Sequence, residues 1–310
     1  MPPRDVHICE TGTRDGLQNL SVFVPTDAKC ALIDGFVAAG VPEIDAGSFV
    51  PPQVVPQFAD VDAVMAHALT QRDVTIGALV PNLKGAQRAL AAGLRLIYFV
   101  ISASESHNRA NVRRTVAEQV EAFRAVRATA DTKPIAERPK LMGAISTSFG
   151  CSIEGRISEK AVVDLARAYA EAGADEIGLA DTVGYATPPL IKSIVKAVRD
   201  EIGEGVPLRL HLHDTLGMGL ANAVAGLEVG IRRFDAAVSG LGGCPFAPGA
   251  RGNIVTEDLV FMLEEMGLRT GIDLARLMET RAILAQHVPA KELTGHLHEA
   301  GIPRALRRAS

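Results

Sequence analysis

Short apolar runs alternate with longer amphipathic segments along most of the chain. In segment 158–172 the apolar side chains recur at the spacing of one helix face, at Ala161, Val162, Leu165, Ala166 and Tyr169. The short apolar runs between such segments predict β-strands. Eight strands are expected, near residues 6–10, 43–48, 74–80, 95–102, 140–146, 176–181, 207–213 and 233–239.

Four of the helical segments end in a glycine, at Gly40, Gly93, Gly173 and Gly230. Four residues after each glycine comes an apolar strand residue, namely Ile44, Ile97, Ile177 and Phe234. Glycine adopts the left-handed conformation that commonly follows the last turn of a helix. The constant offset therefore predicts the same helix-to-strand junction at four places.

Eight strands that alternate with helices in one continuous run predict a (β/α)8 TIM barrel. We assign residues 5–285 to the barrel domain and residues 286–310 to a short C-terminal extension. A doubly wound open sheet is the alternative α/β fold. That fold favours a glycine-rich phosphate turn after its first strand, and the segment ETGTRDGLQN does not contain one.

Composition narrows the class of protein. The chain has 310 residues, 47% of them hydrophobic, and a formal net charge of −4 from 32 basic and 36 acidic residues. This balance provides no basic stripe, so we expect no nucleic-acid partner. No apolar run reaches the roughly 18 residues that span a membrane, and the N-terminus shows no signal peptide. Four irregularly spaced cysteines indicate reduced thiols, and we expect a cytoplasmic protein without a membrane partner.

Reactive side chains follow several of the expected strands. Arg14, Asp15 and Gln18 come after the first strand, Asp45 lies in or at the end of the second, His211 and His213 end the seventh, and Cys244 and Asn253 follow the eighth. In a TIM barrel, the active site lies at the carboxyl ends of the strands. The sequence therefore predicts that these residues meet at one mouth of the barrel.

His211 and His213 favour a metal site. Residues two apart on a strand point to the same face, so their imidazoles lie side by side. Asp15 and Asn253 offer the oxygen ligands that a hard divalent cation needs, and Mg²⁺, Mn²⁺, Co²⁺, Fe²⁺ and Zn²⁺ all suit such a mixed site. Asp214 alternates away from the histidines, which suggests a structural role.

A second histidine pair, His296 and His298, lies in the C-terminal extension. No strand pattern surrounds it, so we expect a loop there and no metal.

The stretch GLGGCPFAPGARGN at 240–253 combines five glycines and two prolines with one cysteine. Such a composition excludes a regular helix or strand and predicts a shaped loop that displays Cys244. A cysteine that only packs is the alternative. Arg14, next to Asp15, predicts a fixed positive charge for a carboxylate or a developing enolate, with a structural ion pair as the alternative.

Three motifs together carry a family resemblance: ETGTRDGLQN, HLHDT and GLGGCPFAPGARGNIVTEDL. With SFV at 48–50, PNLKG at 81–85 and DTVGYATP at 181–188, the chain resembles 3-hydroxy-3-methylglutaryl-CoA lyase from about residue 5 to residue 285. The RD and HxH elements are shared with related condensing enzymes. The GLGGCP loop with its downstream asparagine is more specific for the lyases.

The resemblance implies a carbon–carbon lyase that cleaves 3-hydroxy-3-methylglutaryl-CoA into acetyl-CoA and acetoacetate. Asp15, His211, His213 and Asn253 match the family's metal ligands, and Mg²⁺ or Mn²⁺ is the expected metal. Candidate catalytic residues are Arg14, Asp45, His211 and Cys244; Arg14 and Gln18 are expected to contact substrate. The expected partners are an acyl-CoA thioester and a second copy of the chain in a homodimer.

Two departures from the family's pattern bear on the substrate. The lyases usually carry glutamate where this chain has Asp45, whose carboxylate lies roughly 1.5 Å farther back. Leu216 and Met218 replace residues that are commonly Tyr and Gln, which favours a more apolar branched 3-hydroxyacyl-CoA. Asn82, Lys84, Asn108 and Arg109 are candidate contacts for coenzyme A, although their positions favour exposed helix starts over ligand contacts.

Other functions stay open at the level of sequence. A related lyase for another thioester, such as citramalyl-CoA, is the nearest alternative. Condensing enzymes such as isopropylmalate or homocitrate synthase normally have additional C-terminal domains, for which this chain has little room. An iron oxygenase would also use two histidines and a carboxylate, but usually on a double-stranded β fold. A scaffold protein would not require reactive residues to gather at one mouth.

Overall fold

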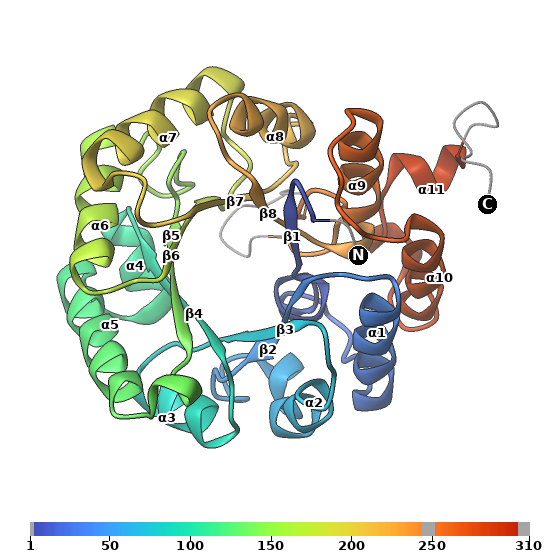
Figure 1. The fold of residues 1–310 in the computed structure, drawn as a ribbon, viewed down its shortest axis with the longest axis horizontal. Coiled ribbons are helices and arrows are strands. Elements are labelled where there is room, and N and C mark those ends of the chain that lie inside the picture. The colour runs from blue at the N-terminus through green and yellow to red at the C-terminus, as the bar shows by residue number, and fades with distance from the viewer. Residues whose placement is uncertain (1–2, 244–251, 303–310) are drawn as a thin grey trace.

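In a computed structural model that describes residues 3–243 and 252–302, eight parallel strands close into a barrel in sequence order (Figure 1). The predicted TIM-barrel fold is confirmed, and each strand lies at its expected place. The strands are β1 (His7–Glu10), β2 (Glu43–Ser48), β3 (Thr75–Leu79), β4 (Leu96–Ser102), β5 (Lys140–Ser146), β6 (Glu176–Asp181), β7 (Leu208–Leu212) and β8 (Arg233–Ala236).

Helices surround the barrel and bury their apolar faces against it. They are α1 (Thr26–Ala38), α2 (Val61–Ala68), α3 (Leu83–Ala91), α4 (Glu105–Val112), α5 (Val116–Asp131), α6 (Glu159–Glu171), α7 (Pro188–Ile202), α8 (Gly219–Glu228), α9 (Thr256–Glu265), α10 (Leu274–Leu284) and α11 (His296–Ala300). Short 3-10 turns occupy Pro56–Phe58, Ile135–Glu137, Val238–Gly240 and Ala290–Glu292. None of the helices that the described residues form is long and apolar enough to cross a membrane.

The four glycine junctions have the conformation that their spacing predicts. Gly40, Gly93, Gly173 and Gly230 have φ values of 81°, 88°, 82° and 90°. After α1, the N–H of Val41 donates to the carbonyl of Phe36 at 3.0 Å, a bond typical of a helix that ends in a left-handed residue. Each junction thus turns the chain directly from a helix into the next strand.

A network of buried charges lies inside the barrel, below the carboxyl ends of its strands. Arg209 on β7 has no solvent exposure, and it contacts carboxylates from three other strands. Its Nη1 lies 2.6 Å from Oε1 of Glu43 and 2.9 Å from Oδ1 of Asp235, and its Nε lies 2.5 Å from Oε1 of Glu176. Removing one member of such a buried network leaves an uncompensated charge, which is strongly destabilising.

The structure corrects one expectation about the C-terminal extension. The segment that contains His296 and His298 forms helix α11 instead of a loop. The helix is anchored to α9 because Asp258 accepts hydrogen bonds from the backbone N–H groups of His296 (2.9 Å) and Leu297 (2.8 Å). In Figure 1, α11 lies beside α9 and α10. Residues 303–310 lie outside the described residues.

Glu10, the last residue of β1, is a fully buried carboxyl group. Its Oε1 accepts hydrogen bonds from the N–H groups of Gly12 (2.8 Å) and Val238 (2.9 Å), and its Oε2 is 2.6 Å from Oγ1 of Thr256. Burial raises the pKa of Glu10 to about 8, and the hydrogen bonds only partly oppose this. The group therefore ties β8 and α9 to β1 in its neutral form.

Folding stability should consequently fall as the pH rises from about 4.5 to about 8, because the folded chain holds a proton on Glu10 that the unfolded chain releases. This group alone lowers the free energy of unfolding by up to about 1.4 kcal/mol for each pH unit in this range. We expect Glu10→Gln to make the slope of unfolding free energy against pH less negative. Urea titrations between pH 5 and pH 8 measure the free energy of unfolding at each pH and so give this slope.

The exposed Glu265 on α9 provides a matched control, since Glu265→Gln removes a carboxyl group that is not buried. An unchanged slope in Glu10→Gln would contradict a neutral Glu10.

Candidate active site

The first part of the site is a tight turn that follows β1. Residues Gly12–Gly16 form one π-helical turn, in which the N–H of Gly16 donates to the carbonyl of Thr11 at 3.1 Å. Only glycine fits at its start, because a Cβ on Gly12 would lie 2.6 Å from Oε1 of Glu10. The turn projects Arg14 and Asp15 into the mouth of the barrel.

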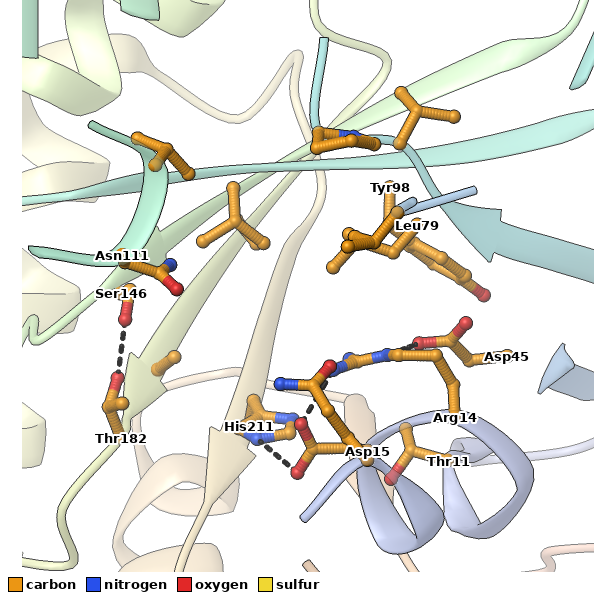
Figure 2. Close-up of a pocket in the computed structure, with 18 of the residues that line it drawn as sticks. Thr11, Arg14, Asp15, Asp45, Leu79, Tyr98, Asn111, Ser146, Thr182 and His211 are labelled. Carbon is orange, nitrogen blue, oxygen red and sulfur yellow. Dashed lines mark hydrogen bonds and ion pairs between the residues drawn. The ribbon is translucent and has the colours of Figure 1, made fainter. Parts of the chain in front are cut away.

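Asp15, His211 and His213 form a cluster at this mouth. One potential ligand atom from each residue lies within 4.8 Å of the others. Oδ2 of Asp15 is 3.8 Å from Nε2 of His211 and 3.6 Å from Nε2 of His213, and the two Nε2 atoms are 3.1 Å apart. The convergence that the sequence predicts is therefore present, and Figure 2 shows Asp15 facing His211.

Asp235 on β8 fixes the orientation of the His211 ring, and the sequence analysis did not identify Asp235 as part of the site. Nδ1 of His211 lies 3.1 Å from Oδ2 of Asp235, and a carboxylate there can only accept, so Nδ1 carries the hydrogen. Nε2 is then left with its lone pair toward the cluster. The register between β7 and β8 is what reveals this partner, since it pairs His211 directly with Asp235.

Asn253 reaches the same cluster from the segment that precedes α9. Its Nδ2 donates to Oδ2 of Asp15 at 2.7 Å and to the carbonyl of Leu241 at 2.9 Å. Its Oδ1 is buried and has no hydrogen-bond partner among the described residues. A buried amide oxygen without a partner, beside a carboxylate and two imidazoles, fits a divalent cation, because such cations are coordinated by oxygen and imidazole ligands together.

The glycine-rich stretch begins directly over these residues. Gly242 has a φ of 99°, and a Cβ there would lie 2.6 Å from Nδ2 of Asn253 and 2.9 Å from the carbonyl of Asp15. Glycine is thus needed for both conformation and close approach. Cys244 itself lies outside the described residues.

Arg14 bridges two carboxylates. Its Nε is 2.6 Å from Oδ2 of Asp45 and its Nη1 is 2.5 Å from Oδ1 of Asp15. Although burial opposes it, the Arg14 charge holds the pKa of Asp15 well below its usual range, with His213 and His211 adding to the effect. Asp15 is therefore ionised and available as a ligand.

Asp45 has a different electrostatic environment. Its pKa is raised to about 7, mainly by burial; Arg14 opposes the rise, and the charges of Asp235 and Asp15 contribute to it. Its Oδ1 is buried without a hydrogen-bond partner among the described residues. A carboxyl group that titrates near neutral pH beside a fixed cation suits proton transfer.

One cavity of about 400 Å³ at the carboxyl ends of the strands is lined by Asp235, His211 and His213. Gln18 lines this cavity, as do Arg14, Asp15 and Asp45. Asp214 does not; its Oδ1 instead accepts from the N–H of Gly219 at 2.7 Å and fixes the start of α8. The structural role that its alternation suggests is thus present.

The four candidate contacts for coenzyme A differ in where they lie relative to the cavity. Asn82 lines the cavity, although its side chain also caps α3 by accepting from the N–H of Gly85 at 3.0 Å. Asn108 is buried and holds local backbone, since its Oδ1 accepts from Ser102 N at 3.0 Å. Arg109 pairs with Glu105 on the surface of α4, and Lys84 does not line the cavity.

Leu216 and Met218 also fall outside the cavity lining, and Leu216 is 57% exposed. The apolar substrate preference that these two residues suggested therefore has no basis at their positions. Sequence reasoning missed a second wall of the cavity, formed by β3–β6 and the end of α4. It includes Leu79, Tyr98, Val100, Asn111, Arg113, Arg114, Ala144, Ser146 and Thr182. The period-two alternation of the strands could have identified its strand residues.

Comparisons with known proteins place this geometry in a family. The HMGL-like family model matches residues 5–284. The mitochondrial hydroxymethylglutaryl-CoA lyase of Gallus gallus is 42% identical over 278 residues, which cover 90% of this chain and 92% of the relative. The rat mitochondrial lyase is 40% identical over 289 residues, covering 93% of this chain and 87% of the relative.

Solved structures show the same likeness. An HMG-CoA lyase from Acinetobacter baumannii, in complex with coenzyme A and 3-methylmalate, superposes with a TM-score of 0.89 at 42% identity and 98% coverage of both chains. The family model and these relatives span nearly the whole barrel, including the residues that form the cluster. The chain therefore belongs to the HMGL-like family.

Proposed function

We propose that this chain is a divalent-metal-dependent lyase that cleaves 3-hydroxy-3-methylglutaryl-CoA into acetyl-CoA and acetoacetate. The relatives named as hydroxymethylglutaryl-CoA lyases and the relative bound to coenzyme A support this activity. The observation that carries the proposal is the convergence of Asp15, His211 and His213 beside the Arg14–Asp45 pair in one open cavity.

Asp15, His211, His213 and Asn253 would hold the metal. Mg²⁺ or Mn²⁺ is the proposed ion, because the carboxylate and amide oxygens are hard donors and both ions accept imidazole. When bound, the cation lowers the pKa of the substrate's tertiary hydroxyl and polarises its oxygens. Asp235 keeps the Nε2 lone pair of His211 directed at the cluster.

The protein's own side chains then stabilise the developing charge and transfer protons. The hydroxyl proton must leave while the C2–C3 bond breaks, and Asp45 can accept it. His211 serves the step as a ligand, because its Nδ1 carries a hydrogen toward Asp235 and its Nε2 would be used by the metal. Arg14 supplies a fixed positive charge for the thioester enolate that develops on the departing acetyl group. Cys244 would return a proton to the C2 carbon, and Gln18 would orient the acyl group. Cys244 lies outside the described residues, so its part rests on family resemblance.

Further aspects of the protein belong to the same proposal. We place the barrel domain at residues 5–285 and the extension at 286–310, and we propose a homodimer in the cytoplasm. A rat lyase named as cytoplasmic is 42% identical over 286 residues and supports the compartment.

Metal removal tests the activity itself. The enzyme loaded with Mg²⁺ or Mn²⁺ should release acetyl-CoA from 3-hydroxy-3-methylglutaryl-CoA, EDTA should abolish the release, and either ion should restore it. Coupled detection of acetyl-CoA and acetoacetate measures both products. A metal-loaded sample that forms neither product contradicts the proposal.

Metal binding can be tested without turnover. We expect His213→Ala to weaken Mn²⁺ binding by at least about tenfold, because one of few protein ligands is lost. The matched control is His298→Ala in the exposed pair on α11, which should bind Mn²⁺ as the wild type does. Titration followed by electron paramagnetic resonance measures the affinity. Equal affinities for both variants would remove His213 from the ligand set.

Asp45 can be separated from the metal ligands. Asp45→Asn should lower kcat by roughly 100-fold or more, since the amide cannot accept the proton, while Mn²⁺ affinity stays within about twofold of the wild type. Asp45→Glu should retain activity, because the carboxylate is kept. A loss of Mn²⁺ binding in Asp45→Asn that matches its loss of kcat would show that Asp45 acts through the metal site instead.

A further inference from the structure

Asn253 lies on a short extended segment that is held on both sides by backbone hydrogen bonds. On one side, the N–H of Ile254 donates to the carbonyl of Leu212 on β7 at 3.0 Å. On the other side, the segment pairs with the chain that follows β8. There the carbonyl of Leu241 accepts the backbone N–H of Asn253 at 3.1 Å and its side-chain Nδ2 at 2.9 Å. Leu241 therefore sets both the backbone and the amide group of this proposed metal ligand.

The chain that leads to Leu241 has an unusual conformation. Ser239 has a φ of 60°, which is rare for a residue other than glycine and persists only where surrounding contacts enforce it. This serine is fully buried. Gly240, which follows it, has a φ of 63°. The two left-handed residues turn the chain from β8 toward Leu241, whose carbonyl faces Asn253.

Every polar group of Ser239 is bound by a residue from outside the barrel strands. Its N–H donates to the two carboxyl oxygens of Glu257 on α9, at 3.2 and 3.1 Å. Its Oγ accepts from Nη1 of Arg281 on α10 at 2.5 Å. Its carbonyl accepts from the N–H and from Oγ1 of Thr294, at 2.8 and 3.1 Å. The two helices and the segment before α11 thus enforce the left-handed conformation together.

Arg281 joins these contacts into one buried network. The Nη1 atom that reaches Ser239 also donates to the carbonyl of Thr294 at 2.6 Å, and it lies 3.6 Å from Oε1 of Glu257. Thr294 lies directly against the turn, because a Cβ on Gly240 would collide with its Oγ1. Thr294 belongs to the C-terminal extension. Part of the extension therefore packs against the chain that holds Asn253.

We propose that Arg281 and Thr294 are positioning residues for the metal ligand Asn253. Through Ser239 they hold the Leu241 carbonyl in place, and this carbonyl binds Nδ2 of Asn253. With Nδ2 bound in this way, the buried Oδ1 is the amide atom that remains for the cation. The inference rests on the proposed function, because it takes Asn253 as a ligand of the metal.

A positioning role differs from a purely structural role in what it does to metal affinity. A network that only stabilised the fold would change the melting temperature and leave the affinity of the folded protein for metal unchanged. A positioning network changes the affinity as well. Its effect on the affinity should disappear when Asn253 no longer has an oxygen to offer, since coupled residues are not additive.

A double-mutant cycle measures this coupling. Arg281→Met should weaken Mn²⁺ binding by about tenfold, because the turn at Ser239 loses one of its anchors. In an Asn253→Ala background, the same substitution should change the affinity by less than about twofold, since no ligand remains to be positioned. The affinities of all four proteins come from electron paramagnetic resonance of free Mn²⁺. Wild-type affinity in folded Arg281→Met, or an equal loss in both backgrounds, would overturn the proposal.

Two further variants complete the set. Thr294→Val keeps the backbone donor to Ser239 and removes only the hydroxyl, so Mn²⁺ affinity should fall by about two- to fivefold with the fold retained. If Arg281→Met does not fold, unchanged affinity in Thr294→Val counts against the proposal. Arg276 lies on the same helix but is exposed and donates to the carbonyl of Ala38. Arg276→Met should therefore bind Mn²⁺ as the wild type does, and a loss equal to that of Arg281→Met contradicts the assignment.

Hydrogen exchange in the metal-free protein separates this inference from the proposed function. Arg281→Met should speed exchange of the Asn253 N–H, which is bound to Leu241, by about tenfold. The N–H of Ile254, which is bound to Leu212, should stay within about twofold of the wild type. Mass spectrometry of overlapping peptides resolves the two groups. Faster exchange at Asn253 in a protein that binds no Mn²⁺ rejects the metal site, whereas normal Mn²⁺ binding with unchanged exchange rejects the positioning role.

Discussion

Arg209 lies at the centre of the barrel, where it forms ion pairs with carboxylates from three strands while wholly removed from solvent. Because Glu43, Glu176 and Asp235 come from β2, β6 and β8, one guanidinium holds together strands on different sides of the barrel. Asp235 uses its other oxygen for Nδ1 of His211. The charge that closes the base of the barrel therefore also orients a side chain of the active site.

Above this base, the site depends on the close approach of backbone segments. The turn at Gly12–Gly16, the residues around Gly242 and the segment of Asn253 pack without room for a Cβ at either Gly12 or Gly242. Asp15 and Asn253 meet only because these segments touch. The opposite side of the cavity comes from β3–β6 and the end of α4, and its strand residues are mainly small or apolar.

Strand order and the main polar cluster could be predicted from the chain, while several local features could not. Period-two alternation placed His211 and His213 on one face, and the glycine offset identified helix-to-strand junctions. The pattern did not reveal the π-helical turn that carries Asp15, since that turn depends on contacts with Glu10 and Leu241. Helix α11 was also missed, because its hydrogen bonds to Asp258 come from a distant part of the chain.

Local rules therefore explain what the sequence by itself determined: the alternation of strands and helices, the barrel, the position of reactive residues at strand ends and the family motifs. Only the tertiary structure decided which groups face each other. Barrel closure pairs β1 with β8. This pairing places Asp15 beside His211, and it places Asp235 on the other side of the His211 ring. The same closure gives Asp45 a pKa of about 7 and places apolar side chains of β3–β6 across the cavity from the charged cluster, because burial and proximity depend on all eight strands together.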